Sequence, residues 1–149
     1  MVRAQNTSPD IQIRLATLED VNELTDNACK LMFESEGETV DKAIIRAAIT
    51  RYLTNPPKGN YYMVAYDNSD SAKKTMGTAM ITHEMNVEQG GLVCWIHNAY
   101  VSGDARRLGV FSNKLYAHIK QISDADPLVK AICLFAEHSN NSAHKRTKN

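Results

Sequence analysis

Residues 92–122 read LVCWIHNAYVSGDARRLGVFSNKLYAHIKQI. The first ten are apolar, β-branched and aromatic for the most part, which predicts a strand over 92–101. Ser102-Gly103-Asp104 breaks this run, and a basic turn that contains a glycine follows over 106–112. Apolar residues then recur at helical spacing and predict a helix over 107–122: Leu108, Phe111, Leu115, Ile119 and Ile122. The order is strand, basic turn, amphipathic helix.

A turn of this kind suits a phosphate or pyrophosphate group. The first N–H groups of a helix have no partner within the helix, and the positive end of its dipole lies behind them. Arg106, Arg107 and Gly109 stand where such a ligand would lie. A basic turn that is only solvated is the alternative, so the rest of the chain must decide.

Three further segments, in the same order, complete a resemblance to the GNAT superfamily of acetyl-CoA-dependent N-acetyltransferases. That family has an Arg/Gln-x-x-Gly-x-Gly/Ala turn after a strand that ends in an aromatic-Val pair, here Tyr100-Val101. Residues 11–20 resemble its opening strand and first helix start, and 76–80 its third strand. Residues 134–140, followed by Ala143, resemble a late strand with an Asn-x-x-Ala helix start at Asn140.

The resemblance implies a set of site residues. The cofactor-binding residues would lie at the end of the strand, in the turn and at the last helix start: Ala99, Tyr100, Val101, Arg106, Arg107, Leu108, Gly109, Val110, Phe111, Ser112, Asn140 and Ala143. His97 is the candidate general base, since its ordinary pKa of about 6.5 lies near working pH. Tyr100 is the candidate acid for the leaving thiolate. Solvent exposure or packing is the alternative for both side chains.

The sequence departs from the family pattern at four places. Phe111 stands where the family has Gly or Ala, so its side chain should turn into the core. The strand before the turn carries His97-Asn98 where many relatives have a carboxylate. Thr147 stands where relatives often have a Tyr that acts as general acid. The chain ends at Asn149, before the last strand of the family's sheet. Truncation, completion of the sheet by a second chain in a homodimer, and a naturally shortened member are three explanations for that end.

Composition agrees with one globular domain over residues 1–149, with 1–10 as a loose tail. The chain has 17 Lys and Arg and 17 Asp and Glu, so no net field favours nucleic acid or a membrane surface as partner. Cys29, Cys94 and Cys133 are far apart, without metal-ligand spacing. We interpret them as reduced thiols of a cytoplasmic protein without a metal. Cys94 as an acyl-carrying nucleophile is the alternative to buried packing.

The remaining patterns predict an α/β (α+β) fold with a mixed, mostly antiparallel sheet flanked by helices. Strands are expected over 11–15, 61–66, 75–85 and 129–136, and helices from Thr17 to Gly37 and over 40–53. A short helix should follow Ser139 or Asn140. The three strands joined by short turns, 61–66, 75–85 and 92–101, predict an antiparallel meander, and the strand–helix–strand unit after residue 92 predicts a parallel crossover.

The function that the resemblance implies is transfer of an acetyl group from acetyl-CoA to a primary amine of a small molecule or peptide, by direct attack. One alternative is a catalytically degenerate module that binds CoA or another protein. Another is a small α/β domain that binds a different phosphate ligand. The sequence does not identify the amine acceptor.

Overall fold

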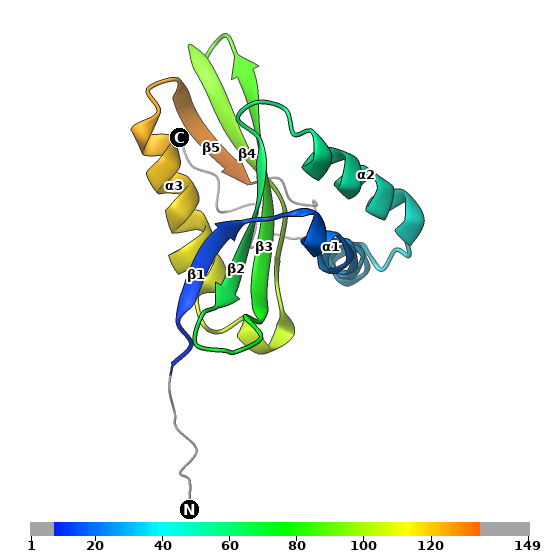
Figure 1. The fold of residues 1–149 in the computed structure, drawn as a ribbon. Helices are drawn as coiled ribbons and strands as arrows, with labels where there is room; N and C mark the ends of the chain where they lie inside the picture. The colour runs from blue at the N-terminus through cyan, green and yellow to red at the C-terminus, as the bar shows by residue number, and fades with distance from the viewer. Residues whose placement is uncertain (1–7, 135–149) are drawn as a thin grey trace, which may run out of the picture.

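The computed structural model describes residues 8–134, and it contains one five-stranded sheet in the order β1-β2-β3-β4-β5 (Figure 1). The strands are β1 (Ile11–Leu15), β2 (Tyr61–Asp67), β3 (Thr75–Asn86), β4 (Gly91–Val101) and β5 (Val129–Leu134). The first four pair antiparallel, and β5 pairs parallel to β4. The predicted mixed α/β sheet is therefore confirmed.

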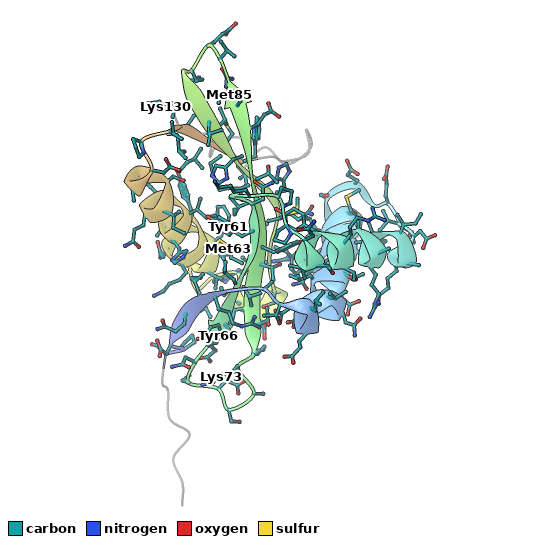
Figure 2. All side chains as sticks on the ribbon, turned by 45° about the horizontal axis from the view of Figure 1, so that its top comes forward. Tyr61, Met63, Tyr66, Lys73, Met85 and Lys130 are labelled. Carbon is teal, nitrogen blue, oxygen red and sulfur yellow. The ribbon has the colours of Figure 1, made fainter. Side chains whose placement is uncertain are left out.

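Helices cover both faces of the sheet. Figure 1 shows α1 (Val21–Glu36) and α2 (Lys42–Thr54) on one side and α3 (Tyr116–Ala125) on the other. Each face has its own core. The larger core lies under α3 and includes Met63, which is fully buried near the centre of β2 (Figure 2), with Ile96 and Ile119. The smaller one joins Leu24, Ile49 and Tyr62 under α1 and α2.

The start of α1 follows the predicted capping box. The Thr17 N–H donates to Asp20 Oδ2 at 2.7 Å, and the reciprocal bond is also present. Arg14 on β1 adds two hydrogen bonds to the same carboxylate, each 2.8 Å long, so this cap also fixes the helix to the sheet. Gly37 ends α1 with φ of 70°, the left-handed geometry that glycine adopts most easily.

The predicted apolar stripe of α2 is only partly correct. Asp41 begins the helix by accepting a hydrogen bond from the Ala43 N–H at 2.9 Å. Ile45, Ile49, Tyr52 and Leu53 pack in the smaller core. Ile44 is 66% exposed and Ala48 is exposed, because α2 contacts the sheet along a narrower stripe than the sequence suggests.

The helix predicted over 107–122 begins later and ends later. Gly109, with φ of 69°, ends the turn, and a π-helical turn (Val110–Leu115) leads into α3. Leu108 precedes the helix and is 45% exposed, so its place in the apolar stripe is wrong. Ile122 is 42% exposed, because the buried side of α3 continues from Leu115 and Ile119 to Ser123. Phe111 is half-buried and packs against the larger core, as expected.

The described part of the strand predicted over 129–136 is β5, while the expected last helix, Asn140 and Ala143 lie outside residues 8–134. No helix within residues 8–134 is long and apolar enough to cross a membrane.

Candidate functional site

A β-bulge interrupts β4 just before its end. Thr78 pairs with Tyr100 and Met80 with His97, so that Ala79 on β3 faces two residues of β4, Asn98 and Ala99. Asn98 has φ of 49°, a left-handed conformation that asparagine tolerates better than most residues. Such a bulge bends its strand and re-aims the groups that follow it.

The bulge coincides with the end of the described pairing between β4 and β5. These strands pair from Leu92 and Val129 to Ile96 and Leu134. Within residues 8–134, no strand pairs with 97–101 on that side of β4. The backbone of Ala99 and Tyr100 thus lies beyond the pairing that residues 8–134 show, at a place where an extended ligand could add as a strand would.

The turn after β4 sits directly on the sheet because β3 has a glycine beneath it. A Cβ placed on Gly77 would lie 3.0 Å from Val110 Cγ1 and 3.1 Å from the Tyr100 carbonyl oxygen. Gly109, in the turn, has a left-handed backbone conformation and directly precedes the helix. The first N–H groups of this helix lack partners within it, which makes the turn a suitable place for an anion. Both glycines are thus required by the local geometry.

The two arginines of the turn have different surroundings. The Nε of Arg106 donates to the Val101 carbonyl at 3.0 Å, and its guanidinium lies 5.4 Å from the centre of the Tyr100 ring. Arg107 is exposed, and none of the ion pairs within residues 8–134 involves it. Leu108 and Ser112 are exposed, and Val110 is buried.

Glu34, near the end of α1, is a member of the site that the sequence reading missed. Its Oε1 accepts from Arg106 Nη2 at 2.6 Å, and its Oε2 accepts from the Tyr100 hydroxyl at 3.0 Å. The hydrogen bond from Arg106 lowers the pKa of the Glu34 carboxyl, and burial with the Glu34 contact raises the pKa of Tyr100. A carboxylate with a lowered pKa is a poor proton acceptor, so Glu34 is a poor substitute for the carboxylate that many relatives have on β4.

His97 lies on the α1/α2 face of the sheet, beside the bulge. Its Nε2 is 2.8 Å from Thr82 Oγ1 on β3, and burial lowers its pKa from the ordinary value. The ring is therefore largely neutral at pH 7, which is the form that can accept a proton. Asn98, next to it, interacts with the hydroxyl of the buried Tyr62.

The structure gives little support to cysteine or metal chemistry in the part it describes. Cys94 is fully buried, and burial raises the pKa of its thiol, which disfavours the nucleophilic thiolate. All three cysteines are free thiols. No group of three or more His, Cys, Asp or Glu side chains that could hold a metal occurs between residues 8 and 134.

A cavity of about 430 Å³ lies beside this site, along the second half of α1 and the connection to α2. Phe33, which is 61% exposed, and Val40 give it apolar walls, and Glu34 and Glu38 add carboxylates. Because Glu34 also touches Tyr100 and Arg106, the cavity adjoins the end of β4.

Solved structures with the same fold were found, whereas no protein-family model and no curated protein matches the sequence. A possible acetyltransferase from Clostridium difficile is 28% identical, with a TM-score of 0.76 over 89% of this chain and 84% of that one. A predicted acetyltransferase with acetyl-CoA from Clostridium acetobutylicum is 17% identical, with a TM-score of 0.67 over 91% and 87%. A GNAT family acetyltransferase from Staphylococcus aureus is 18% identical, with a TM-score of 0.64 over 87% and 89%.

These matches confirm the resemblance to the GNAT superfamily that the sequence predicts. The chain has the fold of these acetyltransferases, a five-stranded mixed sheet flanked by helices.

Proposed function

We propose that this protein is a cytoplasmic N-acetyltransferase that moves an acetyl group from acetyl-CoA to a primary amine of a small molecule or peptide. The observation that carries the proposal is the sequence of features along one strand: a bulge at Asn98, an unpaired stretch within the described residues, then a glycine-started helix. One strand thus offers backbone groups for an extended ligand arm and a helix start for its phosphates.

Acetyl-CoA would supply an activated thioester. The turn and the end of β4 would each bind a different part of it. The N–H groups of the turn from Arg107 to Ser112 would hold the pyrophosphate, with charge from Arg107; the Leu108 N–H is less suitable because it donates to the Ala105 carbonyl at 3.1 Å. The backbone of Ala99 and Tyr100 would pair with the pantetheine arm. The Val101 carbonyl already accepts from Arg106, so it is a less suitable partner.

The acetyl transfer needs three further groups. A backbone N–H near Tyr100 or Val101 would stabilise the negative charge that develops on the thioester oxygen. The amine nitrogen forms the new bond to the carbonyl carbon while the carbon–sulfur bond breaks. His97, neutral at pH 7, would accept the proton that the amine loses, directly or through water. Tyr100 could return a proton to the leaving thiolate only if its hydroxyl leaves Glu34.

A catalytically degenerate module that binds CoA or another protein is the second candidate. Two observations favour it: the Tyr100 hydroxyl already donates to Glu34, and β4 has His97 and Asn98 where many relatives have a carboxylate. Such a module would bind acetyl-CoA without transferring its acetyl group.

Release of free thiol from acetyl-CoA, measured with a panel of primary amines, tests the proposed activity. An enzyme releases thiol faster with at least one amine than with buffer alone, and the product carries one acetyl group. Binding of acetyl-CoA with thiol release no faster than background hydrolysis for every amine would favour the degenerate module.

A further inference from the structure

The ion pair between Glu34 and Arg106 joins two parts of the chain that are 72 residues apart in sequence. Arg106 stands at the start of the cofactor turn, and Glu34 is in the last turn of α1. Both carboxylate oxygens are used, one by the Arg106 guanidinium at 2.6 Å and one by the Tyr100 hydroxyl at 3.0 Å. The end of α1 is thus fastened to the end of β4 and to the turn by two hydrogen bonds.

Arg106 is held on three sides. Its Nη2 donates to Glu34, its Nε donates to the Val101 carbonyl, and its guanidinium lies over the Tyr100 ring. A side chain with these contacts points back along β4. Arginine suits this role because its planar group can donate from several nitrogens in fixed directions.

The charges around Arg106 also indicate that it holds the turn and does not bind the phosphates. The Glu34 carboxylate compensates most of the positive charge that Arg106 could offer to a phosphate. Arg107, next in the chain, is exposed and takes part in no ion pair within the described residues. The two adjacent arginines therefore differ in what remains available for a ligand.

We propose that Glu34 is a positioning residue for the cofactor turn, which acts by holding Arg106 as a brace, and that Arg107 is the cation that meets the phosphates. The inference rests on the proposed function, in that the turn is the pyrophosphate site. It assigns to Arg106 a mechanical role in place of direct contact with the ligand.

The test compares acetyl-CoA dissociation constants by calorimetry in about 0.5 M salt, where the Debye length of roughly 4 Å suppresses long-range charge effects. Glu34→Gln should weaken binding about 2- to 5-fold, the range that corresponds to a partly exposed pair. Arg106→Gln should weaken acetyl-CoA binding more than Glu34→Gln does. The double variant, Glu34→Gln with Arg106→Gln, should bind acetyl-CoA as weakly as Arg106→Gln alone, because both substitutions remove the same contact. When the titrations are repeated at about 0.1 M salt, Arg107→Gln should be the variant whose affinity for acetyl-CoA changes least between the two salt concentrations.

Asp26→Asn is the matched control. Asp26 is on the same helix, forms an ion pair with Lys42 at 2.5 Å and is 46% exposed, against 42% for Glu34. Asp26→Asn removes the same charge as Glu34→Gln at a residue that does not contact the turn, so the affinity for acetyl-CoA should not change. If Glu34→Gln binds acetyl-CoA as well as the wild type or better, while Arg106→Gln binds it more weakly, Arg106 contacts the phosphates itself and the proposal is wrong.

Hydrogen exchange separates this inference from the proposed function. Without any ligand, the bonded amides of Leu108 and Asn113, which donate to the carbonyls of Ala105 and Gly109, should exchange faster in Glu34→Gln than in the wild type or in Asp26→Asn, while those of β1 remain unchanged. If the wild-type chain binds no acetyl-CoA, the proposed function is wrong. The exchange rates still test whether Glu34 and Arg106 hold the turn in place. Equal exchange in the turn of all three proteins would overturn this inference.

Discussion

Gly109→Ala should weaken acetyl-CoA binding as well as reduce stability. Gly109 has φ of 69° and lies between the basic turn and the π-helical turn that begins at Val110. A Cβ at this position would also collide with the side-chain amide nitrogen of Asn113, which can rotate away. The substitution therefore strains the backbone at the point where the phosphate-binding N–H groups are aimed.

The expected cost follows from the backbone conformation. A left-handed conformation costs a residue with a Cβ about 1–2 kcal/mol relative to glycine. For a chain of 149 residues, this lowers the melting temperature by about 2–8 °C. Each hydrogen bond lost to a charged phosphate is worth about 1.5–3 kcal/mol, which makes the affinity roughly 10- to 100-fold lower.

Gly90→Ala is the matched control for this experiment. Gly90 has φ of 80° in the turn between β3 and β4, and no described atom lies within 4 Å of a Cβ placed there. It should lose similar stability and keep the affinity for acetyl-CoA, measured by calorimetry. Equal affinity of Gly109→Ala and the wild type would refute the assignment of the turn to phosphate binding.

Three other predictions concern individual side chains. His97→Gln should lower kcat/KM about 100-fold or more if His97 is the base. Because burial lowers the pKa of His97, kcat/KM of the wild type should rise with pH through a pKa below 6.5, and an identical profile in His97→Gln would exclude this role. Asp20→Asn should cost about 1–2 kcal/mol in urea unfolding at pH 7, since the hydrogen bond from Arg14 lowers the pKa of Asp20. That stability is present above the unfolded pKa of 3.8 and is lost as the pH falls through the lower pKa of the folded chain, so the difference between the two proteins should shrink as the pH falls below 3.8. A difference that does not shrink with falling pH would contradict the ion pair as its cause. Cys94→Ala should retain acetyl transfer, and mass spectrometry should find no acetylated Cys94 in the wild type; an acetyl group on that thiol would reverse this reading.

Local sequence signals predicted most of the fold. The Thr17–Asp20 cap, the Gly37 stop and the strand β1 each depend on residues close in sequence, and all three are confirmed, although Leu15 at the end of β1 is 63% exposed. The crossover from β4 to β5 followed from the strand–helix–strand order. Helical spacing alone could not reveal that Leu108 precedes the helix. The helix begins with a π turn at Val110, and Leu108 still fits the apolar spacing of the residues that follow.

The site was only partly predictable, because it depends on contacts between distant segments. The turn with Arg106 and Gly109 was recognised from its residues, but Glu34 gave no motif. One physical signal was available: Glu34 and Glu36 stand in the last turn of a helix, where the dipole disfavours negative charge, so a compensating partner could be expected. The bulge had a similar signal, an asparagine within an apolar strand.

Thermal unfolding with and without acetyl-CoA, with ADP as the control ligand, tests the central claim most directly. At about 100 times the dissociation constant, a ligand that binds only the folded chain adds roughly 2.7 kcal/mol of stability. For this chain length the account predicts a rise in melting temperature of about 5–11 °C with acetyl-CoA and little change with ADP. No rise with acetyl-CoA up to millimolar concentration, or an equal rise with ADP, would contradict the claim that the bulged strand and the turn after it form an acetyl-CoA site.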